Sequence, residues 1–119
     1  MTSEGDAPIE NAVYDPELTK ALNNINGLFG DLCIRVCGEV WGKPLIPQRT
    51  KALITIALDV ANSSFHGPGV PFETHVKMAL KLGATYEEIE ELLLFACAYC
   101  GFNKSAGAFG QLKKMMTEI

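Results

Sequence analysis

Apolar residues recur at helical spacing through most of the chain, and no segment alternates as a half-buried strand does. In the first third, residues spaced by three or four share one helical face: Leu18, Leu22, Ile25, Phe29, Leu32 and Val36. Asp15 and Pro16 are typical of a helix N-cap and first position. Asn26-Gly27 and Gly30 interrupt the stripe and predict a kink or two short helices.

The segment 48–62 is apolar around most of its circumference. Its polar residues form one narrow stripe: Lys51, Thr55, Asp59 and Asn62. We therefore expect a helix that is buried on most sides. A Gly/Pro-rich loop, Ser63–Pro71, follows, and then a second helix that begins at Phe72 and is closed by Gly83.

Two further helices are expected near the carboxyl end. A capping box at Thr85 and Glu88 opens the first, and Gly101 ends it. Its predicted inner face is Ile89, Leu92, Leu93, Ala96, Tyr99 and Cys100. The last helix, from about Asn103 to Met116, is expected to bury Phe102, Ala106, Phe109, Leu112 and Met116. The two glycines and two prolines of Gly38–Pro47 predict a connection without regular structure.

These elements predict an all-α domain of five or six helices over residues 15–119, preceded by a flexible arm, residues 1–14. The chain has 119 residues, of which 48% are hydrophobic. This fraction is high for a small soluble domain, and it predicts apolar surface that is buried between subunits of a homo-oligomer.

Composition also excludes several classes of function. The net charge of −4 and the scattered basic residues argue against nucleic-acid binding. No apolar run approaches the ~20 residues of a membrane span. The polar, acidic start is no signal peptide, and the four cysteines are then expected to be reduced thiols in a cytoplasmic protein.

Arg49 and His75 are the candidate functional residues, because each shares a helical face with apolar side chains. Arg49 falls on the face of Leu53 and Ile56, and His75 on that of Phe72. A structural role is the alternative: Arg49 pairs with a neighbouring acid, and His75 is a core imidazole that donates to a backbone carbonyl.

Ordered segments between Gly38 and Phe102 resemble the carboxymuconolactone decarboxylase family. They are Gly38-Glu39-Val40-Trp41, Pro47–Leu53, Phe72-Glu73-Thr74-His75, Gly83-Ala84-Thr85 with Glu87-Glu88-Ile89, and Ala98–Phe102. The resemblance implies a small helical subunit that forms trimers or hexamers, the hexamer being favoured. It also implies cofactor-free lyase chemistry on a small carboxylated lactone or keto acid.

Decarboxylation needs a group that holds the substrate anion and a group that supplies a proton. A guanidinium suits the first role and an imidazole the second, so Arg49 would hold the anion and His75 would move the proton. Glu39 would orient His75, and Trp41 would form an apolar wall. His66, in the Gly/Pro loop, is a candidate second polar contact; no cofactor or metal is expected.

A sister branch of the superfamily, the alkylhydroperoxidase D-like proteins, reduces peroxides with a C-x-x-C-x-x-x-H motif. Counted back from His75, its cysteine positions hold Pro68 and Pro71. Two further departures, Lys51 where family members usually have Arg and Cys100 where they have Ala, leave the substrate open.

Two other functions remain as alternatives. Cys97 and Cys100 form a C-x-x-C that could serve a thiol peroxidase, although it lies near a helix end whose dipole disfavours a thiolate. With Cys33 and Cys37 they could in principle bind zinc. The third possibility is a non-catalytic subunit that binds a small ligand or serves in assembly.

Overall fold

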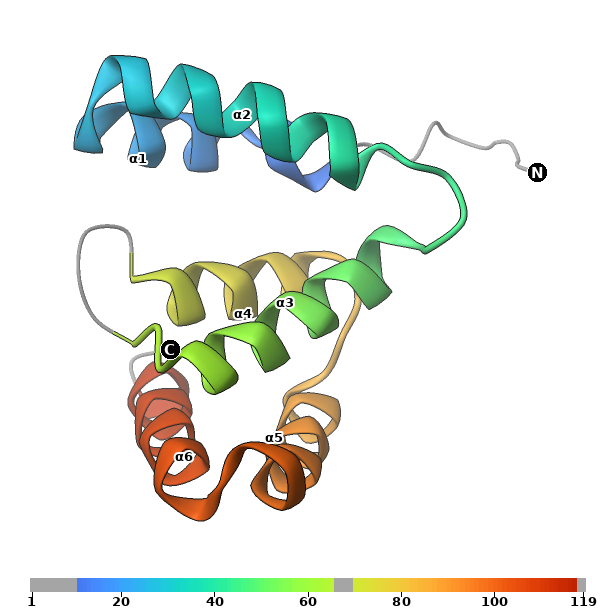
Figure 1. The fold of residues 1–119 in the computed structure, drawn as a ribbon, viewed down its shortest axis with the longest axis vertical. Coiled ribbons are helices and arrows are strands. Elements are labelled where there is room, and N and C mark those ends of the chain that lie inside the picture. Colours follow the sequence, from blue (N-terminus) through green and yellow to red (C-terminus); the bar gives the residue numbers. More distant parts are fainter. Residues whose placement is uncertain (1–10, 66–69, 118–119) are drawn as a thin grey trace. The chain divides into compact units, whose positions relative to one another are not determined.

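The computed structural model describes residues 11–65 and 70–117. All regular structure in these residues is helical, so the predicted all-α class is confirmed (Figure 1). The chain divides after Gln48 into two compact units, which are described separately. No helix in the described residues is long and apolar enough to cross a membrane.

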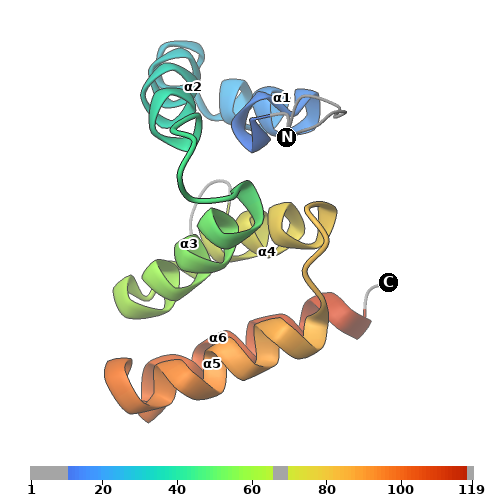
Figure 2. The ribbon, with the colours of Figure 1, turned by 90° about the vertical axis from the view of Figure 1, so that its right-hand side faces the viewer.

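The first unit holds a short 3-10 helix, η1 (Ala12–Tyr14), and two α-helices, α1 (Pro16–Ile25) and α2 (Gly27–Trp41). As predicted, Asp15 caps α1, with its side chain accepting from the backbone amide of Glu17, and Pro16 takes the first position. The extended residue Asn26 ends α1 and caps α2, so the stripe divides into two helices at this point. The two helices pack side by side (Figures 1 and 2).

The prediction of an irregular connection over Gly38–Pro47 is wrong for its first four residues, because α2 continues to Trp41. Gly38 lies inside the helix beneath the ring of Tyr14, and a Cβ there would be 2.7 Å from the Tyr14 hydroxyl oxygen. This glycine therefore permits a close approach instead of ending the helix.

Part of the predicted N-terminal arm, residues 11–14, is folded onto α2. Val13 of η1 is buried, and the Asn11 side-chain amide donates to the Gly38 carbonyl at 2.7 Å. Gln48 accepts from the backbone amide of Ala12 at 2.9 Å and donates to the Trp41 carbonyl at 2.5 Å. The Gln48 side chain thus joins η1 to the end of α2.

The second unit holds α3 (Gln48–Asn62), α4 (Pro71–Lys81), α5 (Tyr86–Cys100) and α6 (Phe102–Thr117). The bounds of α3 match the prediction, and α4 begins one residue earlier than expected. Gly83 and Gly101 adopt φ angles of +100° and +102°, as glycines that end helices do. The predicted capping box of Thr85 and Glu88 is present.

The core of the second unit draws on all four of its helices. Its fully buried large side chains are Ile56, Val60, Phe72, Val76, Ile89, Leu93 and Leu112. In α6, however, the buried residues are Ser105, Ala108, Leu112 and Met115. The predicted inner face of α6 was therefore wrong except at Leu112 and, in part, Phe109.

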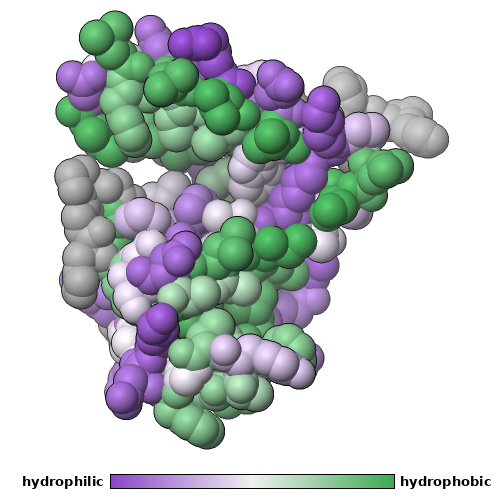
Figure 3. Space-filling model, viewed as in Figure 1, coloured by the Kyte–Doolittle hydropathy of each residue, from purple (hydrophilic) through white to green (hydrophobic). Residues whose placement is uncertain are grey.

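The predicted inner face of α5 was wrong at Tyr99, which is 79% exposed, whereas Ile89, Leu93 and Ala96 are buried as expected. Phe102, at the start of α6, is 76% exposed. Figure 3 shows hydrophobic surface over the first unit as well. Leu28 and Leu32 of α2 are among its exposed large apolar side chains. Each unit thus presents apolar surface that its own helices do not cover.

Candidate functional site

His75 pairs with Asp59 between α4 and α3. The imidazole Nδ1 lies 2.5 Å from the carboxylate Oδ2 of Asp59. The Asp59 side chain is 9% exposed and that of His75 is 24% exposed, so the carboxylate is buried while the imidazole edge reaches solvent. The bond places the Nδ1 proton toward Asp59 and leaves Nε2 as the ring nitrogen that can exchange a proton with a ligand.

The apolar faces of α3 and α4 position the His75–Asp59 pair. Asp59 follows Ile56 and precedes Val60, both fully buried, and His75 lies one turn after the fully buried Phe72. These neighbours hold α3 against α4 and bring the two polar groups together in surroundings where each needs a partner.

Sequence reasoning placed Asp59 on a polar stripe and did not identify it as a functional residue. A signal was present, because Asp59 is the one acid in α3 and lies in its last turn. A negative charge there opposes the helix dipole, so it requires a nearby donor. Its partner is His75, and the alternative of a backbone carbonyl as the Nδ1 acceptor is therefore wrong.

Arg49 does not point into the core, contrary to the expectation from its helical face. Its guanidinium Nη2 pairs with Oε2 of Glu88 in the first turn of α5, and the two side chains are 38% and 43% exposed. Glu88 also accepts the Thr85 backbone amide through Oε1, at 2.9 Å. The bond to Arg49 and the cap at Thr85 lower the pKa of Glu88.

Arg49 and the His75–Asp59 pair belong to opposite ends of α3. Arg49 and Asp59 are ten residues apart, which corresponds to about 15 Å along the helix axis. The guanidinium turns toward α5, whereas Asp59 faces α4. The two groups are therefore held by different neighbouring helices, at opposite ends of α3.

The remaining predicted site residues lie elsewhere in the chain. Glu39 is exposed on α2, and Trp41 is half-buried at its end; both belong to the first unit. Their convergence with Arg49 and His75 stays a prediction. His66 lies outside the described residues.

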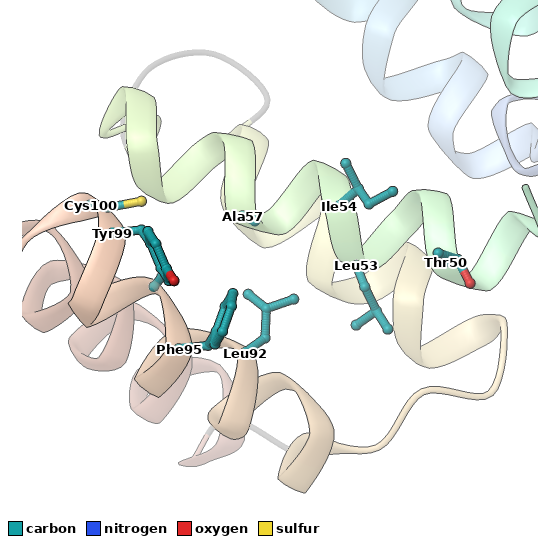
Figure 4. Close-up of a pocket in the computed structure, with 9 residues that line it drawn as sticks. Thr50, Leu53, Ile54, Ala57, Leu92, Phe95, Tyr99 and Cys100 are labelled. Carbon is teal, nitrogen blue, oxygen red and sulfur yellow. The ribbon is translucent and has the colours of Figure 1, made fainter.

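An open apolar groove of about 320 Å³ lies between α3 and α5 (Figure 4). It is lined by Thr50, Leu53, Ile54, Ala57, Leu92, Phe95, Ala96, Tyr99 and Cys100. Asp59 comes two residues after Ala57, which puts it about 160° away around α3. The groove and the His75–Asp59 pair therefore occupy opposite faces of this helix.

The cysteines form two separate pairs of free thiols. Cys33 and Cys37 project from α2 with their sulfurs 3.9 Å apart, whereas Cys97 and Cys100 lie in the last turn of α5. Burial raises the pKa of the Cys33 thiol, and the Cys37 thiol raises it further. Among the described residues, no three His, Cys, Asp or Glu side chains are grouped as a metal site would require.

Comparison with known proteins adds independent information. The model of the carboxymuconolactone decarboxylase family matches residues 28–114, from α2 into α6. The chain is 29% identical over 99 residues to the 4-carboxymuconolactone decarboxylase of Acinetobacter baylyi, covering 82% of this chain and 71% of that protein. It is 31% identical over 64 residues to the nitrosuccinic acid decarboxylase of Metarhizium robertsii, covering 54% of this chain and 42% of that protein. No solved structure matches.

Proposed function

Because the chain belongs to the carboxymuconolactone decarboxylase family, we propose that it is a cofactor-independent decarboxylase, or a related carbon–carbon lyase. Its substrate would be a small carboxylated lactone or keto acid. Two relatives named as decarboxylases support the reaction class, and the His75–Asp59 pair is the structural observation that carries the proposal.

In the proposed reaction, the bond between the substrate carbon and its carboxylate breaks, and carbon dioxide leaves. The electron pair stays on the substrate and is delocalised into the adjacent carbonyl or lactone. His75, protonated on both nitrogens, then donates its Nε2 proton to that carbon and is reprotonated from water. Asp59 holds Nδ1 and stabilises the positive charge of the imidazolium, which fixes the ring for this transfer.

Arg49 would hold the substrate anion, because a guanidinium presents a planar set of donors that matches a carboxylate. Trp41 would supply an apolar wall, and Glu39 a second carboxylate near the imidazole. The four cysteines are free thiols, which supports a reducing, cytoplasmic setting for this enzyme.

The separation of Arg49 from His75 makes self-association part of the proposal. A site that uses both groups on one small substrate takes Arg49 from one copy and His75 from another. Exposed apolar side chains in both units, among them Leu28 and Phe102, support a closed assembly, for which a trimer or hexamer is the expected form.

Release of carbon dioxide from a panel of carboxylated lactones and keto acids tests the reaction. We expect His75→Gln to abolish release and Asp59→Asn to lower kcat about 10- to 100-fold, the usual cost of losing a carboxylate that orients a functional imidazole. Lys77→Gln, on the exposed side of the same helix, is the matched control and should keep full activity. Full activity in a folded His75→Gln variant would remove this assignment.

Mixing two inactive variants tests the shared site. If Arg49→Ala and His75→Ala subunits are unfolded together and refolded together, mixed oligomers would contain sites with both side chains intact, and part of the activity would return. If each variant is inactive and no activity returns on mixing, Arg49 and His75 do not act across subunits.

A further inference from the structure

The contact between Arg49 and Glu88 uses the negative charge of Glu88, which neither the hydrogen bond of the helix cap nor the packing of the core requires. Glu88 uses Oε1 for the Thr85 amide and Oε2 for the guanidinium. A capping box accepts Gln as well as Glu at this position, because the cap needs only an acceptor oxygen. The negative charge of Glu88 therefore acts on Arg49 and on the dipole of α5, whereas the hydrogen bond of the cap does not require it.

The pair is also placed where a ligand can reach it. Both side chains are more than one-third exposed, and an ion pair in such a position contributes little stability because water solvates both partners. Glu88 engages one guanidinium nitrogen, Nη2. A free carboxylate that approached the planar fork through two nitrogens would form the stronger bidentate arrangement.

We propose that Glu88 is a built-in competitor of the substrate: its carboxylate occupies Arg49 in the empty enzyme and is exchanged for the carboxylate of the incoming substrate. This inference rests on the proposed function only in assigning Arg49 to the substrate anion. It makes Glu88 a determinant of affinity for anionic substrates, although Glu88 takes no part in the proton transfer. Glu88 is charged at neutral pH, as an ordinary carboxylate is, and its bond to Arg49 lowers its pKa further.

The test replaces Glu88 by Gln, which keeps an acceptor for the cap and removes the charge. Glu87→Gln is the matched control, because Glu87 is exposed, lies in the same first turn and carries the same charge. The probe is succinate, and binding at low salt is followed by NMR through the backbone amide of residue 49, which every variant has, and through the Arg49 Nε–H group where arginine is present. We expect Glu88→Gln to bind succinate about two- to fivefold more tightly than the wild type, as the loss of a surface ion pair allows.

Glu87→Gln should match the wild type, and Arg49→Lys should weaken binding whether residue 88 is Glu or Gln, since the fork is lost. Thermal melts establish that the α5 cap is intact in each variant. Equal affinity in the wild type and Glu88→Gln, or no response of the Arg49 signal to succinate in any variant, would overturn the inference.

Turnover separates this inference from the proposed function. With a true substrate, Glu88→Gln should lower KM by the same factor as the change in succinate affinity and leave kcat unchanged. If no panel substrate is decarboxylated but Glu88→Gln still binds succinate more tightly, the proposed function fails and the competitor role stands. If decarboxylation proceeds and KM is unaffected by Glu88→Gln, the competitor role fails alone.

Discussion

His75 and Asp59 differ in burial, so removing one partner should cost more stability than removing the other. This prediction can be tested without a substrate. Asp59→Leu removes the buried carboxylate and leaves an imidazole that is 24% exposed and has lost its partner. His75→Phe keeps the ring shape and leaves a carboxylate that is only 9% exposed and has lost its partner. Since a buried carboxylate without a partner costs more than a partly exposed imidazole that water can solvate, the second change should be the more damaging.

The expected magnitudes follow from this difference in burial. We expect Asp59→Leu to lower the free energy of unfolding by about 1 kcal/mol, typical of one lost hydrogen bond. His75→Phe should lower it by about 3 kcal/mol, at the lower end for a broken buried pair. In the double variant both polar groups are gone, so the free energy should return to within about 1 kcal/mol of the wild type. The coupling energy, which is the sum of the two single costs minus the cost of the double variant, is then at least about 3 kcal/mol.

Urea unfolding at pH 7 measures the free energy of unfolding of the wild type, the two single variants and the double variant, with circular dichroism and tryptophan fluorescence as two probes. All four proteins must be compared at one concentration, because association contributes to apparent stability. Coincident curves from the two probes support two-state analysis, which matters in a chain with two units. Additivity of the single changes within about 0.5 kcal/mol, or a larger cost for Asp59→Leu than for His75→Phe, would refute the reasoning.

Three shorter predictions concern other parts of the chain. Gly30→Ala should destabilise by about 1 kcal/mol in urea unfolding, because its Cβ would lie 3.0 Å from backbone of α1, whereas Gly110→Ala, in open space, should stabilise by up to about 1 kcal/mol. Cys37→Ser should speed alkylation of Cys33 by iodoacetamide at pH 8, because the neighbouring thiol helps to raise the Cys33 pKa. The lowered pKa of Glu88 gives stability that is present above about pH 4.3, the ordinary Glu pKa, and lost as pH falls through the folded value. Thermal melts at pH 6 and 3 should therefore show a larger loss in the wild type than in Glu88→Gln.

The helix bounds were largely predictable because local signals set them. Asp15, Thr85 and the glycines at positions 83 and 101 act on residues one or two turns away, and each ends or begins a helix where the sequence indicated. The failure at Gly38 has the opposite cause. Its reason for being glycine is the Tyr14 ring, 24 residues earlier in the chain, and no local rule reveals such a contact.

The buried faces of α5 and α6 were harder to predict, since apolar residues occur around most of each helix. Leu94, Phe95 and Tyr99 give the outer side of α5 as strong an apolar pattern as its buried side. In α6, the small residues Ser105 and Ala108 face the core, and the large Phe102 faces outward. Periodicity identifies a helix, but it does not select between two apolar faces.

Of the His75–Asp59 pair, the sequence pattern indicated His75 and not Asp59. His75 was identified from its apolar neighbours, and in the structure it lies one turn from the buried Phe72 with its Nδ1 paired to Asp59. Its partner was missed because Asp59 aligns with three polar residues on α3, a pattern that indicates a solvated face. For Arg49 the structural alternative, pairing with a neighbouring acid, is what the structure contains, and an anion-binding role has to coexist with that pair.

Self-association would resolve two features of the chain together. One is the separation of Arg49 from His75, and the other is the set of apolar side chains that no helix covers. In the second unit, Asp59, which pairs with His75, and Arg49 stand at opposite ends of α3, about 15 Å apart along the helix axis. The exposed side chains in the middle of α5 are acidic, as Glu90 and Glu91 are, or apolar, as Leu94 and Phe95 are, and none carries a positive charge that would hold a small anion. Large apolar groups left in water favour association, and association is also what would bring a second guanidinium within reach of an imidazole. In the proposed enzyme, therefore, α3 carries both Arg49, which would need assembly to reach an imidazole, and the exposed apolar side chains of Ile54 and Leu58, which favour assembly.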